Sequence, residues 1–288
     1  MIPTKEQMDS LVERKLATVK KHNGLNLYKY HRKVFYNNLW HLDPALMECR
    51  GVVFADDGEL VQLPFRKVFN VGENGTQIDD NTVYKISRKV NGFMAAMTQH
   101  QGKMLVTTTG SFTSNFVNMA EKHIKMTFPR GIEEGTVLFE ICDDQDPHIV
   151  HEKTGSYLLA TRLKSDGEIV FPNRNYDHSL FEQEADGCTI KEMVKNCKHE
   201  GYCIYTLNNE PVAKMKSPHY LSKKAIMRLG DGKVDIMYDN KQEFRKRLDE
   251  EFYNLLDFIT ESFKKSEWKL MKDQERRKVI EDYFGDNV

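Results

Sequence analysis

The tetrapeptide Lys89-Val90-Asn91-Gly92 closely follows a run, Thr82-Val83-Tyr84-Lys85-Ile86-Ser87, whose residues favour a β-strand. A free lysine has a pKa near 10.4, so only about one molecule in a thousand carries the nucleophilic amine at neutral pH. A reactive lysine here needs burial or nearby positive charge that lowers its pKa by roughly three units, about 4 kcal/mol. Without such neighbours, the tetrapeptide is more typical of an exposed turn.

The composition of the chain is that of an ordinary globular protein. Its 288 residues are 40% hydrophobic and 30% charged, and the formal net charge is -1, so any site for a polyanion must be a local patch. The five cysteines form no C-x-x-C pair, which indicates reduced thiols and neither a zinc site nor a disulfide framework. There is no apolar run of about 18 residues and no secretory h-region, which predicts a cytoplasmic protein without a membrane span.

The N-terminal part of the sequence predicts one helix and a half-buried sheet. Thr4 and Gln7 form a capping box, and apolar residues at helical spacing predict a helix to about Lys21 that stops near Asn23-Gly24. The following segment, residues 28–40, mixes aromatic and basic side chains. Such a mixture can bind nucleic acid, but strand propensity favours a half-buried sheet by about three to one.

The C-terminal part of the sequence predicts helices. Thr189 and Glu192 form a second capping box, for a short helix that ends near Lys198. Beyond about Leu221 apolar residues recur at helical spacing. The segment from Lys223 onward has 15 Lys and Arg against 15 Asp and Glu, so its composition is not that of a basic clamp.

Two glutamates and two lysines stand out because they lie at or in apolar strand-like runs. Glu140 and Glu200 each need a partner if buried, and for either residue alone a structural salt bridge or a rim position is the simpler interpretation. Lys214 and Lys216 lie on the same face of a strand, where they repel each other unless anions compensate. Taken alone, that pair is typical of a solvated edge strand.

The order of these residues along the chain favours a common chemistry. Lys89, two later glutamates and a Lys-x-Lys strand match the order of parts in a covalent nucleotidyltransferase. In such an enzyme a neutral lysine attacks the α-phosphorus of ATP, releases pyrophosphate and holds AMP as a phosphoramidate. Paired lysines can bind the phosphate and, as neighbouring cations, also lower the pKa of the nucleophile.

These motifs resemble those of ATP-dependent RNA ligases of the bacteriophage RNA ligase 1 type, which belong to the covalent nucleotidyltransferase superfamily with DNA ligases and capping enzymes. The resemblance spans roughly residues 25–220. Five segments are similar to the superfamily's motifs I, III, IIIa, IV and V, in that order: Lys89-Val90-Asn91-Gly92, Leu138-Phe139-Glu140, residues 157–162, Glu200-Gly201-Tyr202 and Lys214-Met215-Lys216. Two upstream segments are similar to segments that distinguish this branch from DNA ligases: Glu48-Cys49-Arg50-Gly51 and Lys67-Val68-Phe69-Asn70.

The resemblance implies a role for each matching residue. Lys89 is the adenylated nucleophile, assisted by Lys214 and Lys216 as phosphate ligands, and Glu200 binds the metal, Mg²⁺ or Mn²⁺. ATP is the nucleotide substrate, with AMP covalently bound to Lys89. The remaining residues are expected to bind the nucleotide: Arg50, Lys67, Phe69, Arg88, Gly92 and Glu140.

Two positions depart from the family pattern. Asn91 stands where an aspartate is commoner, so a charge that could bind metal or ribose is missing. Thr109, before Gly110-Ser111, stands where relatives often have a basic residue.

The expected fold is α+β, with an antiparallel-sheet nucleotidyltransferase (adenylation) domain over residues 1–221 and a small all-helical C-terminal domain over residues 222–288. The expected partner is RNA with 5′-phosphate and 3′-hydroxyl ends, and the resemblance suggests nicked tRNA and RNA repair. A monomer is expected. Three alternatives stay open: another covalent nucleotidyltransferase, such as a DNA ligase or capping enzyme, a non-catalytic nucleic-acid-binding module, and a protein-modifying AMP transferase. The helical rather than OB-like tail counts against the first.

Overall fold

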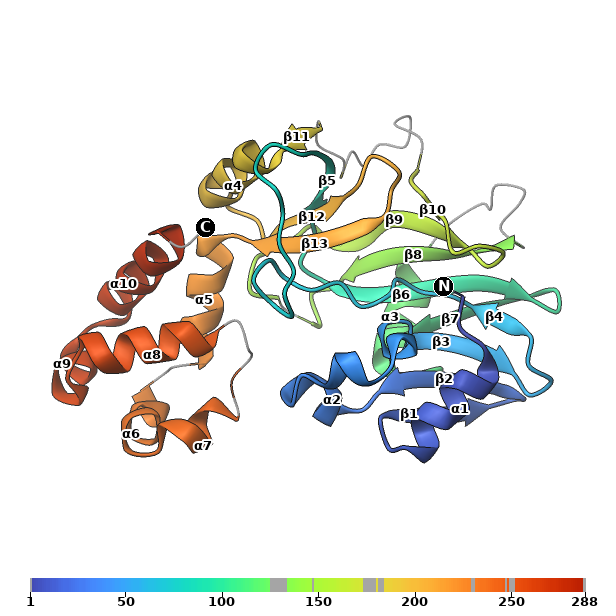
Figure 1. Ribbon diagram of the computed structural model, residues 1–288, viewed down its shortest axis with the longest axis horizontal. Helices are drawn as coiled ribbons and strands as arrows, with labels where there is room; N and C mark the ends of the chain where they lie inside the picture. The colour runs from blue at the N-terminus through green and yellow to red at the C-terminus, as the bar shows by residue number, and fades with distance from the viewer. Residues whose placement is uncertain are drawn as a thin grey trace. The chain divides into compact units, whose positions relative to one another are not determined.

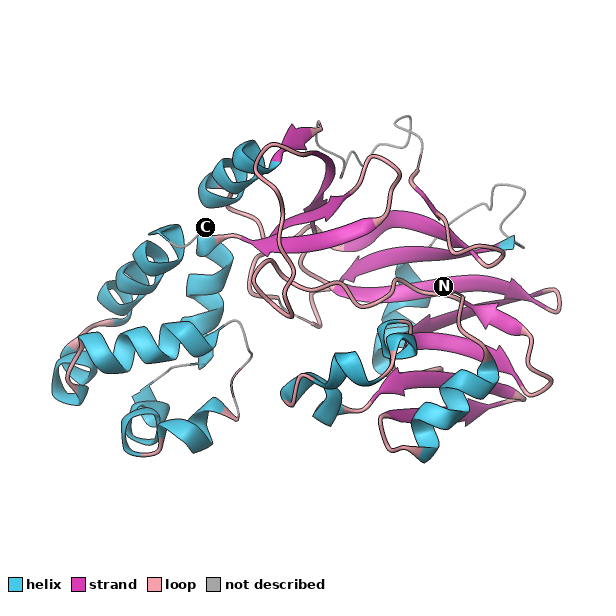
Figure 2. Ribbon diagram, in the orientation of Figure 1, coloured by secondary structure: helices cyan, strands magenta, loops and turns pink. Residues whose placement is uncertain are grey.

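The computed structural model describes residues 2–124, 134–146, 148–172, 180, 184–228, 231–246, 248 and 252–286. The chain forms two compact units, and its elements are labelled in Figure 1 and coloured by type in Figure 2. The first unit comprises Met1–Val68, Val90–Glu182 and Tyr205–Pro211, and the second comprises Phe69–Lys89, Gln183–Ile204 and Val212–Val288. The chain therefore passes from the second unit to the first directly after Lys89.

The first unit starts with helix α1 (Lys5–Glu13) and a hairpin of strands β1 (Ala17–His22) and β2 (Leu25–Tyr30). The predicted capping box is confirmed at the start of α1. The predicted continuation of this helix to about Lys21 is wrong, because Val19 pairs with Tyr28 in the hairpin. Asn23 and Gly24 have φ of 48° and 77°, the left-handed backbone of a two-residue hairpin turn. The dipeptide that resembled a helix stop thus joins two strands.

Two antiparallel sheets organise the described part of the first unit. Its elements after the hairpin are α2 (Arg32–Tyr36), η1 (Leu39–Leu42), η2 (Pro44–Met47), β3 (Arg50–Ala55), β4 (Leu60–Gln62), β6 (Phe93–His100), β7 (Lys103–Thr108), α3 (Asn115–His123), β8 (Gly135–Cys142), β9 (Gly155–Leu163) and β10 (Ile169–Val170). The N-terminal sheet has the order β1-β2-β3-β4, and the second has the order β10-β9-β8-β6-β7. Helix α3 packs Ala120 against the core of the second sheet, which includes Ala95 and Val137.

The third sheet belongs to the second unit apart from Tyr205, Pro211 and the turn between them. Its order is β11-β5-β12-β13, with β5 (Val83–Lys89), β11 (Ala185–Asp186), β12 (Gly201–Tyr205) and β13 (Pro211–Lys216). Helix α4 (Gly187–Asn196) packs Ile190 and Val194 into the core of this sheet. The predicted cap of this helix at Thr189 is wrong by one turn, since Asp186 accepts the hydrogen bond from Thr189 N.

The C-terminal part of the chain is helical, as the sequence predicts. Its helices are α5 (Pro218–Arg228), α6 (Asp231–Asp239), α7 (Lys241–Arg245), α8 (Tyr253–Ser262), α9 (Lys265–Leu270) and α10 (Asp273–Asp286). They share one hydrophobic core, in which Trp268, Leu255 and Ile280 are fully buried. The predicted α+β fold with antiparallel sheets and a helical C-terminal part is confirmed. Helix α5 itself spans the domain boundary that the sequence suggested at residues 221 and 222.

Within the described residues, no helix is both long enough and apolar enough to cross a membrane.

Candidate active site

Lys89 is the last residue of β5, and its side chain ends against a buried carboxylate. Lys89 Nζ donates a hydrogen bond to Glu200 Oε2 at 2.9 Å, and the exposed fractions of the two side chains are 19% and 4%. Glu200 directly precedes β12, the neighbour of β5 in the sheet. A carboxylate this buried is costly unless it is paired. The neighbouring positions of β5 and β12 in the sheet bring the lysine to it. The contact holds Lys89 as an ammonium, which must lose a proton before its nitrogen can act as a nucleophile.

The residues on either side of Glu200 are also constrained. Gly201 has a φ of 139°, and a side chain there would collide with the carbonyl oxygen of Met215. Gly201 N donates a hydrogen bond to His199 Nδ1 at 3.3 Å. Burial, together with the positive charge of Arg88, lowers the pKa of His199 to about 4. His199 is therefore neutral at pH 7 and adds no charge beside Glu200.

Strand β13 presents two of the predicted lysines on one face. Ala213 and Met215 are buried in the core of the third sheet, whereas Lys214 and Lys216 are half-buried on the alternate positions. The predicted placement of both lysines on the same face is confirmed. The backbone of Lys214 also donates a hydrogen bond to the carbonyl oxygen of Phe69 at 2.9 Å. The second unit thus places Phe69 next to this strand.

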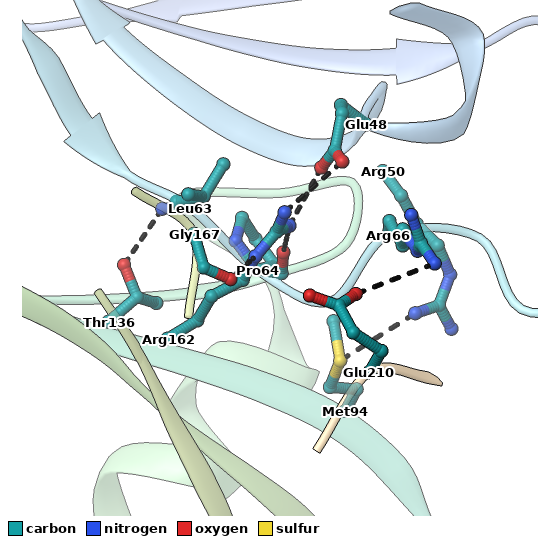
Figure 3. Close-up of polar contacts among 10 residues, drawn as sticks. All are labelled: Glu48, Arg50, Leu63, Pro64, Arg66, Met94, Thr136, Arg162, Gly167 and Glu210. Atoms are coloured by element: carbon teal, nitrogen blue, oxygen red, sulfur yellow. Dashed lines mark hydrogen bonds and ion pairs between the residues drawn. The ribbon is translucent and has the colours of Figure 1, made fainter. Parts of the chain in front are cut away.

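The first unit brings three other predicted residues close to one another. Glu140 Oε1 accepts a hydrogen bond from Gly92 N at 3.2 Å, and a side chain on Gly92 would collide with the Ile141 carbonyl oxygen. Met94 lies directly opposite Glu140 in the pairing of β6 with β8. Arg50 Nη1 lies 3.7 Å from Met94 Sδ, as Figure 3 shows. Arg50, Gly92 and Glu140 therefore lie around one end of β6.

Lys67 lies against aromatic rings of the first unit. Its Nζ is 5.2 Å from the centre of the Phe35 ring and 5.3 Å from that of Trp40. A cation near ring faces is stabilised by the ring quadrupole. The aromatic and basic segment of residues 28–40 is thus partly a support for Lys67.

Asn91 has a structural contact at the position where the family pattern favours aspartate. Its side chain is buried, and its Oδ1 accepts a hydrogen bond from Val150 N at 3.0 Å. The carbonyl oxygen of Asn91 also lies 3.8 Å from Cys142 Sγ. The amide therefore anchors the segment that follows β8.

Glu48, two residues before Arg50, forms a buried ion pair with Arg162. Arg162 on β9 donates to both carboxylate oxygens of Glu48, at 2.7 Å and 3.1 Å, and its Nη1 also donates to the Pro64 carbonyl oxygen at 2.7 Å. Figure 3 shows this bidentate contact, whose side chains are only 6% and 7% exposed. The pair fixes the end of η2 to the second sheet, and with it the start of β3 where Arg50 lies.

Glu200 is the predicted metal ligand. Within the described residues, no group of three or more His, Cys, Asp or Glu side chains could hold a metal ion. One carboxylate nevertheless fits Mg²⁺, which proteins often bind through one or two carboxylates together with substrate phosphates. The donor chemistry of Glu200 is thus compatible with a metal bound with the nucleotide.

Sequence reasoning missed two residues near these groups. His199 could have been noticed because it directly precedes Glu200. Lys29 lies opposite Arg50 in the pairing of β2 with β3, and no pattern in the sequence indicates that register.

The fold is similar to that of ATP-dependent ligase nucleotidyltransferases. An archaeal ATP-dependent RNA ligase superposes with a TM-score of 0.57 at 13% identity, over 98% of this chain and 77% of that chain. A putative ATP-dependent DNA ligase from Aquifex aeolicus superposes with a TM-score of 0.54 at 13% identity, over 96% of this chain and 78% of that chain. At these identities the likeness concerns the fold alone.

A family model described as RNA ligase matches residues 48–221, more than half of the chain. The chain belongs to this RNA ligase family. RNA ligase 1 of Bacteriophage TS2126 is 26% identical over 152 residues, which cover 46% of this chain and 38% of that relative. The chain thus matches well under half the length of this curated relative. The match covers the predicted residues from Arg50 to Lys216.

Proposed function

We propose that the protein is an ATP-dependent RNA ligase that works through a lysyl-AMP intermediate. Lys89 Nζ attacks the α-phosphorus of ATP, a P–N bond forms, and the bond to pyrophosphate breaks. An oxygen of an RNA 5′-phosphate then attacks the AMP phosphorus and releases Lys89. Finally an RNA 3′-hydroxyl attacks the activated 5′-phosphorus, a phosphodiester forms, and AMP leaves.

The contact between Lys89 and Glu200 is the observation that supports this proposal most strongly. The Lys89 side chain is only 19% exposed, and its Nζ lies 2.9 Å from a buried carboxylate. This environment is unusual for a lysine, which is mostly found in contact with solvent. Membership of the RNA ligase family supports RNA rather than DNA as the joined polymer.

The other predicted residues take supporting roles in the proposal. Lys214 and Lys216 bind the α-phosphate, and Arg50 and Lys67 contact the triphosphate or the α-phosphate. Glu140 accepts a hydrogen bond from the ribose. The nucleotide-binding set is completed by Phe69, Arg88 and Gly92. Glu200 holds Mg²⁺ or Mn²⁺, and the metal, when bound, neutralises charge on the phosphates.

Incubation with ATP labelled at the α-phosphate and Mg²⁺, followed by denaturing electrophoresis, tests the proposal. We expect a covalently labelled band in the wild type and none in Lys89→Ala. Lys85→Ala, a lysine on the same strand, is the matched control and should retain the label. Equal labelling of Lys89→Ala and the wild type would sink the assignment, and no labelling of the folded wild type would favour a nucleic-acid-binding module.

The RNA substrate is tested with the labelled protein. We propose single-stranded or nicked RNA with 5′-phosphate and 3′-hydroxyl ends, including nicked tRNA. Transfer of the label to 5′-phosphorylated RNA, and its absence with 5′-phosphorylated DNA of the same sequence, is the expected result. Transfer to DNA alone would favour a DNA ligase, and transfer to another protein would favour a protein-modifying AMP transferase.

A further inference from the structure

Lys29 in the N-terminal sheet has no role so far, and it lies beside Arg50, one of the proposed nucleotide ligands. Lys29 on β2 and Arg50 on β3 are direct partners in the antiparallel pairing of these strands. Side chains of direct partners lie on the same face of a sheet, with Cβ atoms about 4.5–5.5 Å apart, and like charges in this position repel each other. A chain whose net charge is -1 thus places two positive charges side by side.

Within the part of the chain that the structure describes, no carboxylate pairs with either cation to offset this repulsion. Among the described residues, neither Lys29 nor Arg50 forms an ion pair, and the polar contact of the Arg50 guanidinium is the sulfur of Met94 at 3.7 Å. Partial burial and the positive charges of Arg50, Lys20 and Arg32 lower the pKa of Lys29. The three side chains that contribute charge at Lys29 are all positive, so its surroundings favour an anion.

The loop after β7 completes the site. A side-chain carbon built on Gly110 would lie 3.3 Å from Lys29 Nζ, so the lysine lies against the Gly110 backbone. A side-chain carbon on Gly51, which has a φ of 94°, would lie 2.9 Å from Thr109 Cα. Strand β2, the start of β3 and the Thr109-Gly110 turn therefore meet, and Lys29 brings a positive charge to a turn that has none of its own.

We propose that Lys29, with Arg50, binds a phosphate group of a substrate of the ligation reaction at the Thr109-Gly110 turn. The inference rests on the proposed function and adds a binding residue to it. An ammonium and a guanidinium that share one face can bind different oxygens of the same phosphate by charge-assisted hydrogen bonds. The bound anion replaces the missing carboxylate and removes the repulsion between the two side chains. Two sources share this chemistry: the triphosphate of ATP and a phosphate of the RNA end.

Inorganic tripolyphosphate is the probe of the site, because its binding requires no chemistry. We expect Lys29→Gln to weaken its binding about tenfold in calorimetric titration, as for the loss of one charge-assisted contact. Lys29→Arg, which keeps the charge, should bind within about threefold of the wild type. Lys103→Gln, which removes an exposed lysine from β7, is the matched control and should bind like the wild type. Equal binding by Lys29→Gln and Lys103→Gln would overturn the proposal.

Two kinetic measurements distinguish the sources of the phosphate. If the site binds ATP, Lys29→Gln raises the ATP concentration for half-maximal self-adenylation and leaves joining of pre-adenylated RNA unchanged. If it binds RNA, the half-saturating concentration of pre-adenylated RNA rises instead. A wild type that binds tripolyphosphate through Lys29 but forms no AMP adduct would refute the proposed function and leave this site standing. An AMP adduct together with unchanged tripolyphosphate binding in Lys29→Gln would support the proposed function and overturn this site.

Discussion

Lys89 and Glu200 form a pair of opposite charges in which each residue has two tasks. In the free protein they stabilise each other, because a carboxylate that is 4% exposed needs a cation nearby. In the proposed reaction the same lysine must become a neutral amine, and the glutamate oxygen at 2.9 Å is a nearby acceptor for its proton. The ion pair is therefore a resting arrangement that the reaction has to break.

Glu200→Gln tests this pairing, since the amide keeps the shape and removes the charge. We expect the rate of self-adenylation to fall about a hundredfold or more, in the range typical for loss of a group that takes part in proton transfer. Single-turnover labelling with ATP measures the effect. Glu192→Gln, a glutamate on the helix that precedes the site, is the control. A Glu200→Gln protein that labels at the wild-type rate would remove this residue from the reaction.

His199 predicts a pH dependence of stability. Because its pKa is lowered to about 4 in the folded protein, the unfolded chain binds a proton first as the pH falls below about 6.5. This residue therefore reduces the free energy of unfolding progressively between pH 6.5 and 4, and has no such effect above that range. We expect His199→Gln to lose less thermal stability than the wild type between pH 7 and 5. An exposed histidine, His41→Gln, is the control, and equal slopes for the wild type and both variants would contradict the prediction.

The residues that sequence alone could predict are those whose order along the chain carries the information. Lys89, Glu140, Glu200 and the Lys214-Lys216 strand could be singled out as candidates because they follow one another in a fixed order, with isolated charges at or in apolar runs. Lys29 could not, because its significance depends on which residue of β3 lies opposite it. A shift of one residue in that register would turn the opposite side chain to the other face.

At the scale of the elements, the Glu48–Arg162 pair determines how η2 is joined to β9. We expect Glu48→Gln to lower the free energy of unfolding by about 3–5 kcal/mol, because it leaves the Arg162 guanidinium buried without its carboxylate. Chemical denaturation measures this change. Glu210→Gln is the control: its contact with Arg66, also drawn in Figure 3, is 3.9 Å long with side chains 65% and 38% exposed, and should contribute less than about 1 kcal/mol. Similar losses in both variants would show that burial is not the cause.

Local sequence patterns predicted some secondary-structure elements correctly and misplaced the end of helix α1. The helical spacing of Leu16 and Val19 suggested one long helix, but Lys15 has a φ of 57° and the chain turns there. Thr18 and Val19 are β-branched, and a strand that can pair with β2 suits them better than a helix does. Pairing with β2 decides that these residues form a strand and not a helix. The periodicity of a short stretch of sequence cannot reveal such a partner.

At the scale of the whole molecule, every residue predicted to take part in adenylation precedes helix α5. The helices from α5 to α10 have their own hydrophobic core. We expect a chain that ends at residue 221 to keep self-adenylation and to lose efficiency in joining RNA. Labelling with ATP and joining of pre-adenylated RNA measure the two steps separately. A truncated chain that remains folded, as judged by circular dichroism, but forms no adduct would contradict this division of tasks.

Peptide mapping by mass spectrometry after incubation with ATP and Mg²⁺ shows whether Lys89 becomes covalently attached to AMP. We expect AMP on the peptide that contains Lys89, removal of this AMP by pyrophosphate or 5′-phosphorylated RNA, and no AMP on peptides that contain Lys214 or Lys216. AMP on another lysine, with Lys89 unmodified, would contradict this expectation.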